Sequence, residues 1–282
     1  MSRKYFCLVA GFPDIFLDET KYSSTLLEFK EYLEQELHPD DFGLIRLIYL
    51  SYDNKNLLDY LIHDTEDFNP LGNYTLEDVK EQMYWLDDIP GVEGGELPPY
   101  MVSFIRNFKS DESGKTYTDW EKYITELYYK HLLETKNDFI ANWFRFELNL
   151  KNILTAVNCR KHNIEIEKQL VTENEVATIL ARNHGADFGL SIEIEDIDYI
   201  IKVAETENLL ERENLIDLYK WNYLDEHTFF HYFTIERVFA YQLKLMMVFR
   251  WMGLDKETGE AMFRSLIKEM KESYEFPEEF KI

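Results

Sequence analysis

The strongest candidate for chemistry in this sequence is a pair of histidines close to a glutamate. His227 and His231 are four residues apart, and Glu236 follows on what the sequence predicts to be the same helix. Residues four apart lie on one side of a helix, so the two imidazoles could share a metal ion with a carboxylate from another helix, such as Glu147. A metal-dependent helical enzyme is therefore one hypothesis for the function.

A packing role for these histidines is the interpretation that we favour. Their spacing is neither HExxH nor the paired ExxH of di-iron helical bundles. Aromatic residues lie between and beside them and indicate packed rings rather than an open coordination sphere, namely Phe229, Phe230 and Tyr232. We predict no metal site, no cofactor and no catalytic residues.

A nucleophilic cysteine is a weaker candidate. Cys159 precedes Arg160 and Lys161, which would lower the pKa of an exposed thiol. The nearby His162 decides nothing, because a catalytic base is recognised by its position in space. We therefore interpret Cys159 as a buried or bystander cysteine. The phosphate-loop, dinucleotide and serine-hydrolase motifs GxxxxGK(S/T), GxGxxG and GxSxG do not occur.

The charge balance excludes whole classes of partner. Against 30 Lys and Arg stand 54 Asp and Glu, a formal net charge of -24. Because nucleic acids and anionic membrane surfaces attract the opposite sign of charge, we predict no nucleic-acid partner. The acidic faces could instead dock to a basic protein surface.

Membrane insertion and export are not expected. No run of about 18 apolar residues occurs, and the richest stretch, residues 229–252, contains several charges. The apolar segment after Lys4 stops at Pro13 without a small-residue cleavage site, unlike a signal peptide. Cys7 and Cys159 show no disulfide or zinc pattern, so we predict reduced thiols in the cytoplasm.

Apolar residues three and four apart recur through most of the chain and predict helices. Threonine followed by an acid three residues on is typical of a capping box, and it predicts helix starts at Thr75, Thr118 and Thr172. After Thr118 the helical pattern continues to Val157.

A long apolar stripe near the end runs from Phe230 to Met252, and Gly253 is placed to cap that helix in the left-handed conformation. A last helix is predicted over residues 258–270. Strand signals are limited to residues 5–10, which could equally begin a helix, and to residues 190–194. The sequence therefore predicts an all-α protein, a multi-helix bundle-like body with at most one short N-terminal β element.

Two breaks suggest how the chain divides. Residues 87–99 hold three glycines and three prolines, and residues 110–116 form a second polar break. We predict a smaller N-terminal helical part, residues 1–110, and a larger C-terminal part, residues 111–282. Since the breaks are too short to act as long linkers, the two parts should pack together.

Asparagine followed by paired aliphatic residues occurs three times, near residues 54, 149 and 208. Asparagine caps helices and the aliphatic pair begins a buried face, so the pattern predicts helix starts; coincidence and a diverged repeat remain equally open. Asn149, Asn152, Arg160 and Lys161 are our candidate interaction patch. Ordinary capping and surface charge explain the same four residues equally well.

Four segments carry a resemblance to a known family: YFCLVAGFPD (residues 5–14), NLKNILTAVNCRKHN (149–163), LDEHTFF (224–230) and FPEEF (276–280). Together they resemble an uncharacterised family of Bacteroides-type bacteria whose members are encoded among the subunits of a V/A-type rotary ATPase. The asparagine-rich segment also resembles the C-type subunit of those enzymes, called the d-type in eukaryotes. The C-type protein is an all-helical funnel without catalytic residues that couples the central stalk to the membrane ring.

The resemblance implies a non-catalytic subunit or accessory protein of a proton- or sodium-transporting V/A-type ATPase. Its partners would be the stalk and membrane-ring subunits, and it would lie in the cytoplasm, held at the inner membrane only through the complex. Two alternatives stay open: the metal-dependent enzyme around His227, His231 and Glu236, and an acidic protein–protein adaptor unrelated to the ATPase.

Overall fold

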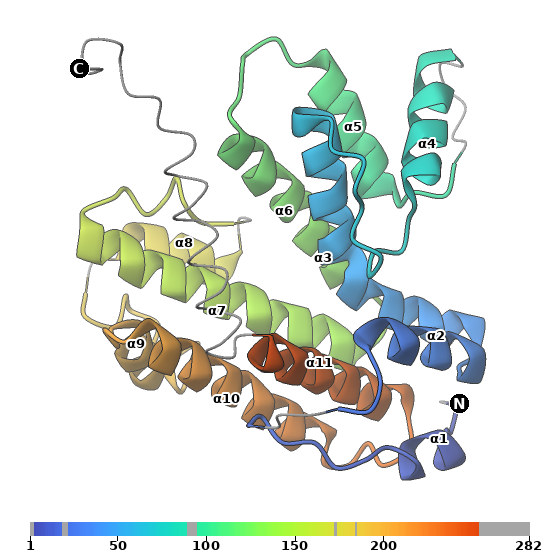
Figure 1. Cartoon of the computed structure of the whole chain (residues 1–282). Coiled ribbons are helices and arrows are strands. Elements are labelled where there is room, and N and C mark those ends of the chain that lie inside the picture. Colours follow the sequence, from blue (N-terminus) through green and yellow to red (C-terminus); the bar gives the residue numbers. More distant parts are fainter. Residues whose placement is uncertain (1–2, 19–21, 89–94, 172–173, 184, 254–282) are drawn as a thin grey trace, which may run out of the picture.

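The computed structural model describes residues 3–18, 22–88, 95–171, 174–183 and 185–253. Within these ranges the protein is all-α and contains no strand, which confirms the predicted fold class (Figure 1). The helices are α1 (Phe6–Ala10), α2 (Leu26–Glu36), α3 (Pro39–His63), α4 (Leu76–Asp88), α5 (Pro99–Ser110), α6 (Tyr117–Leu133), α7 (Asp138–His162), α8 (Glu175–Arg182), α9 (Ile197–Ala204), α10 (Leu209–Thr228) and α11 (Ile235–Met252). None of these described helices combines the length and the apolar character that a bilayer crossing requires.

Both candidate strands have other conformations. Residues 6–10 form the short helix α1, the helical alternative for that segment, and the Tyr5 backbone N–H donates to the Phe233 carbonyl at 2.7 Å. Residues 190–194 form turns rather than a strand. Phe188 has a positive φ of 54° and Gly189 one of 72°, so the chain turns sharply just before this segment.

Of the three helix starts predicted from capping boxes, one is confirmed, and the other two helices begin at other residues. The Thr75 hydroxyl accepts from the Asp78 N–H at 3.2 Å, which confirms that capping box. The next box is built by Thr116 with Asp119, so α6 begins two residues before the predicted start at Thr118. Helix α8 is capped by Asn174; Thr172 lies outside the described residues.

Other helix ends also differ from the sequence predictions. Gly253 ends α11 with a φ of -75°, so the predicted left-handed cap is wrong. The two long predicted stretches are each interrupted: Asn137 caps a new helix after α6, and residues 229–234 form a turn between α10 and α11. The predicted helix over 258–270 and the segment 276–280 lie outside the described residues.

The asparagine pattern does not mark helix starts consistently. Asn208 caps α10, and its side chain accepts from the Leu210 and Glu211 backbone N–H groups. Asn149 and Asn152, however, lie in the middle of the 25-residue helix α7. The predicted helix start at these two residues is therefore wrong.

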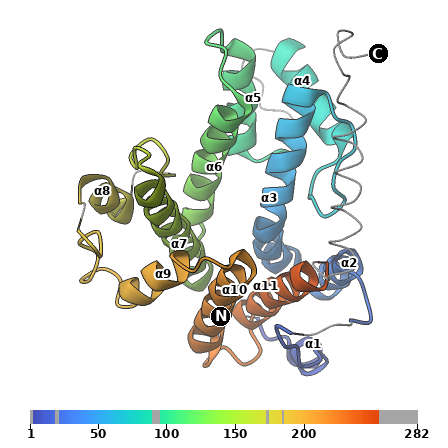
Figure 2. The same ribbon diagram turned by 60° about the vertical axis from the view of Figure 1, so that its left-hand side comes forward.

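Two hydrophobic cores meet along α7. Its first half contributes Ile140, Trp143 and Phe144 to a core shared with α1–α6 and α11. Its second half contributes Ile153 and Val157 to a smaller core shared with α8, α9 and the start of α10. In Figures 1 and 2 the helices α8 and α9 lie by one end of α7, and α3–α6 rise from the other. The larger core includes residues from both sides of position 110. The predicted division of the chain into two parts at this position stays a prediction.

Buried polar side chains fasten the loop between α3 and α4. Asp53 on α3 accepts hydrogen bonds from the backbone N–H groups of Asn73 at 2.6 Å and Tyr74 at 3.1 Å. The Lys30 ammonium on α2 donates to the carbonyls of Leu71 at 2.9 Å and Gly72 at 2.7 Å. These bonds satisfy loop backbone groups that would otherwise be buried without partners.

Candidate functional site

The two histidines of the metal hypothesis lie on different elements. His227 is in the last turn of α10, whereas His231 lies in the following turn and Glu236 lies in the first turn of α11, so the predicted single helix is wrong. The His227 ring stacks on Tyr223 with a centroid distance of 3.8 Å, and its Nδ1 lies 2.9 Å from the Tyr223 carbonyl oxygen. Among the described residues, no group of three or more His, Cys, Asp or Glu is arranged to hold a metal ion.

His231 and Glu236 do lie together. The His231 Nδ1 is 3.5 Å from the Glu236 Oε2, and Asn137 donates to the other carboxylate oxygen at 2.9 Å. Burial acts to raise the pKa of Glu236, but hydrogen bonds from Thr234 and Asn137 outweigh it and lower that pKa. Glu147, the carboxylate suggested from another helix, instead pairs with Lys220 at 3.4 Å.

The candidate interaction patch is used largely inside the protein. Asn152 is fully buried, donates to the Val171 carbonyl at 2.9 Å and accepts from the Val171 N–H at 3.0 Å. Asn149 accepts from the Asn174 side chain at 3.2 Å. Both asparagines therefore attach the segment around α8 to α7.

Arg160 has a similar role, while Lys161 is exposed. The Arg160 guanidinium donates to the Ala186 carbonyl at 2.9 Å and lies over the Phe188 ring at 4.3 Å. It therefore holds the turn before residue 190. Cys159 is buried, and this burial raises the pKa of its thiol, which opposes reactivity.

Among the described residues, the most exposed cluster of aromatic side chains lies in the turn between α10 and α11, residues 229–234, here called the aromatic turn. Phe229, Phe230 and Tyr232 are 64%, 81% and 62% exposed. The sequence interpretation of these rings as packed residues is wrong. In Figure 1 the aromatic turn lies beside α1, whose Phe6 is also exposed and contacts the Phe233 ring at 4.8 Å.

The backbone of the aromatic turn is held at several points. The His231 N–H donates to the Thr228 carbonyl at 2.9 Å, and the Tyr5 N–H donates to the Phe233 carbonyl. The Arg237 guanidinium donates to the buried Thr228 hydroxyl at 3.3 Å. Exposed rings on a held backbone lose little conformational entropy on binding, which favours docking.

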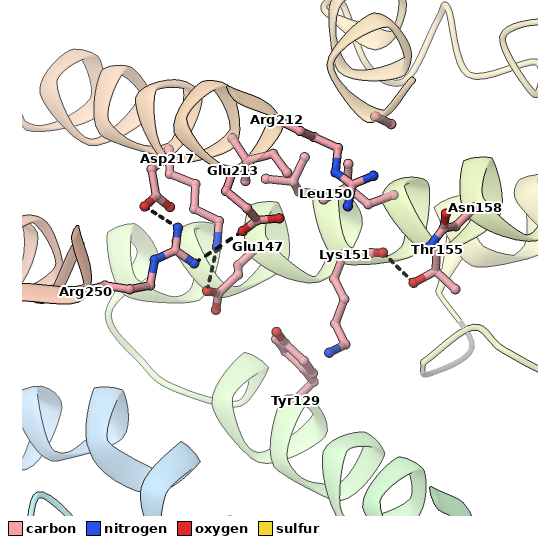
Figure 3. Close-up of a pocket in the computed structure, with 14 residues that line it drawn as sticks. Tyr129, Glu147, Leu150, Lys151, Thr155, Asn158, Arg212, Glu213, Asp217 and Arg250 are labelled. Carbon is pink, nitrogen blue, oxygen red and sulfur yellow. Dashed lines mark hydrogen bonds and ion pairs between the residues drawn. The ribbon is translucent and has the colours of Figure 1, made fainter. Parts of the chain in front are cut away.

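A cleft along α7 is the second candidate site, and it has two compartments that share Tyr129, Glu147 and Lys151. The first, the Arg250 compartment, measures about 370 Å³ and is lined by side chains from α6, α7, α9, α10 and α11 (Figure 3). The second, the Trp143 compartment, measures about 500 Å³ and lies among α3, α6, α7 and α11.

Ion pairs occupy much of the Arg250 compartment. Figure 3 shows the Arg250 guanidinium between two carboxylates, those of Asp217, which is buried, and Glu213 at 3.5 Å. The Trp251 indole N–H also donates to Asp217 at 2.8 Å. With Lys220 paired to Glu147 on the opposite wall, these contacts join α7, α10 and α11, which is a structural role.

Several polar groups that line the Trp143 compartment have no partner among the described residues. The indole N–H of Trp143 is buried and has no hydrogen-bond acceptor. Desolvation, with the nearby Glu147 charge, raises the pKa of both Tyr128 and Tyr129, so their hydroxyls stay protonated. Sequence reasoning missed this site because tyrosine and tryptophan at helical spacing look the same whether they fill a core or line a cleft.

Comparison with known proteins gives a family and no characterised relative. No curated protein and no solved structure matches the chain. The model of one family, described as "Protein of unknown function (DUF2764)", matches residues 1–274. Because this match spans nearly the full length of 282 residues, the chain belongs to the DUF2764 family.

Proposed function

We propose that the protein is a non-catalytic component of a V/A-type rotary ATPase that works by docking, in the manner of a C-type coupler between the stalk and the membrane ring. The observation that carries the docking role is the aromatic turn. The ATPase assignment rests on the resemblance of four sequence segments, and the all-helical fold is compatible with it.

The size of the exposed apolar surface supports docking. Taking about 200 Å² for a whole aromatic side chain, Phe229, Phe230 and Tyr232 together expose roughly 400 Å². Patches of roughly 300–600 Å² are the largest that typical monomers carry, and they often serve function. Aromatic residues are also the usual anchors at the centre of protein interfaces.

The body behind the aromatic turn is suited to transmitting force. Helix α7 runs through both hydrophobic cores, so the cores cannot move apart without breaking this helix or unpacking its side chains. Protein interiors packed at this density resist compression. A load applied at the aromatic turn, next to α10 and α11, would thus be carried into α7 through the cores.

Affinity purification of the tagged protein from its native host, in low and high salt, tests the proposal. We expect the stalk and ring subunits to be recovered, and recovery to fall in high salt because surface charge pairs are screened. The double variant Phe229→Ser with Phe230→Ser should reduce recovery at least tenfold, since two anchor rings are removed.

The matched control is Ile192→Ser, because Ile192 is 94% exposed but lies far along the chain from the aromatic turn, in the segment between α8 and α9. It should leave recovery unchanged. Equal recovery by the double variant and the wild type would rule out the aromatic turn as the docking surface. Absence of ATPase subunits with the wild type in both salts would contradict the ATPase assignment and favour an unrelated adaptor.

A further inference from the structure

We propose that the Trp143 compartment binds a small organic anion, a molecule with one carboxylate or sulfonate group on an aromatic or aliphatic body. This inference is independent of the docking function. It rests on the volume, the apolar walls, the free hydrogen-bond donors and the charge of the compartment.

The size and walls fit a small molecule. A volume of about 500 Å³ lies within the range of roughly 300–1,000 Å³ typical of ligand sites. Four helices supply apolar walls, formed by Ile48, Leu58, Ile124, Phe144, Leu243 and Met246. These side chains can cover the body of a ligand and exclude water from it.

Three hydrogen-bond donors that line the compartment have no acceptor among the described residues. Trp143 is 1% exposed, and its indole N–H has no partner. In the described part of the chain, the hydroxyls of Tyr128 and Tyr129 form no hydrogen bond either. Because a buried donor without a partner costs free energy, a ligand oxygen that accepts from the Trp143 indole N–H would be stabilised here.

The charge points to an anion. Lys55 and Lys151 line the compartment, and within the described residues neither ammonium has an ion-pair or hydrogen-bond partner. One of the two lining carboxylates, Glu147, is already paired with Lys220, which leaves Glu121 as the opposing charge. With the Glu147–Lys220 pair counted as neutral, the lining carries two lysines against one glutamate, although the chain as a whole has a net charge of -24.

Calorimetric titration of the full chain tests this site with three probes, two anions and one cation, each of which has an apolar body. We expect saturable one-to-one binding of 8-anilinonaphthalene-1-sulfonate and of decanoate, with decanoate displacing the fluorescent sulfonate. Decylamine, with the same chain length and a positive charge, should bind at least tenfold more weakly than decanoate.

Variants locate the binding. Lys55→Gln with Lys151→Gln removes two exposed, unpaired charges, so the fold should persist and decanoate affinity should fall about tenfold. Trp143→Phe keeps an aromatic side chain, although a smaller one, and removes the indole N–H, so it should weaken binding about three- to tenfold. Lys161→Gln, an exposed lysine on the same helix but outside the compartment, is the control and should change nothing.

Three results would overturn the proposal. The first is the absence of saturable binding by either anion. The second is decanoate binding that is unchanged in the double lysine variant, and the third is equal affinity for decanoate and decylamine. Thermal unfolding of each variant without probe separates a lost site from a lost fold, and the double lysine variant decides the question if Trp143→Phe does not fold.

Discussion

At the scale of single residues, the buried charges under the loop between α3 and α4 are unusual in a protein whose acids are mainly on the surface. Burial raises the pKa of Asp53 to about 6, against partial compensation by its hydrogen bonds from Tyr74 and Asn73 and by Lys30. Burial likewise lowers the pKa of Lys30 to about 8. Both charged forms therefore cost stability, and the loop is held in spite of that cost.

Asp53 gives the protein a defined pH dependence of stability. Between its unfolded pKa near 4 and its folded pKa of about 6, the folded state binds more protons, so stability falls as the pH rises through this window. The free energy of unfolding of wild type and Asp53→Asn is compared by urea denaturation, because the contributions of the other titrating groups are the same in both proteins and cancel. The stability of wild type relative to the variant should drop by roughly 2–3 kcal/mol from pH 4 to pH 7. A difference that does not vary with pH would contradict the buried position of this carboxylate.

Asn152 fixes the segment before α8. Asn152→Ala should lower the free energy of unfolding by about 2–4 kcal/mol, because two hydrogen bonds to Val171 are lost and both backbone groups stay buried. Hydrogen exchange at the Val171 amide should quicken in the same variant. Asn149→Ala, which removes one contact to Asn174 from a half-buried site, is the control and should cost less than about 1 kcal/mol.

At the scale of elements, the sequence predicts helices better than it predicts where they end. In the described residues the apolar spacing correctly indicates helices, because each must bury one face. The breaks after Leu133 and Thr228 contain no glycine or proline, so only the capping asparagine at position 137 signals the first of them. The aromatic turn gives no signal, since the apolar pattern continues through residues that turn out to be exposed.

The start of α6 tests which threonine caps that helix. The Thr116 hydroxyl accepts from the Asp119 N–H at 3.3 Å, while Thr118 lies exposed inside the first turn. Thr116→Ala should therefore destabilise the protein by about 1 kcal/mol. Thr118→Ala should change stability by less than about 0.5 kcal/mol. Both free energies of unfolding are measured by chemical denaturation. A larger loss of stability for Thr118→Ala than for Thr116→Ala would support the helix start at Thr118 that the sequence predicts.

At the scale of the whole molecule, the sequence predicts the fold class and the acidity but neither candidate site. Both sites depend on which aromatic side chains the fold covers. The turn between α10 and α11 leaves the rings of the aromatic turn exposed, and the arrangement of α3, α6, α7 and α11 forms the Trp143 compartment. Two residues that the sequence pattern suggested for partner binding have internal contacts instead. Asn152 and Arg160 were candidates for contact with partners, and the structure uses them to join segments of this chain.

The acidic surface and the aromatic turn have separate roles in the account of docking. A net charge of -24 would speed encounter with a basic partner and repel anionic surfaces, whereas the rings would hold the complex once it has formed. Raising the salt concentration should thus slow association, and removing the rings should speed dissociation.

The most direct test of the central claim is site-specific photo-crosslinking in the native host. A benzophenone amino acid replaces Phe230 in one strain and Ile192 in another, since both side chains are well exposed, and the crosslinked proteins are identified by mass spectrometry. The account predicts crosslinks to V/A-type ATPase stalk or ring subunits from position 230 and far fewer from position 192. Crosslinks from position 230 to other proteins alone, or ATPase crosslinks of equal yield from both positions, would contradict it.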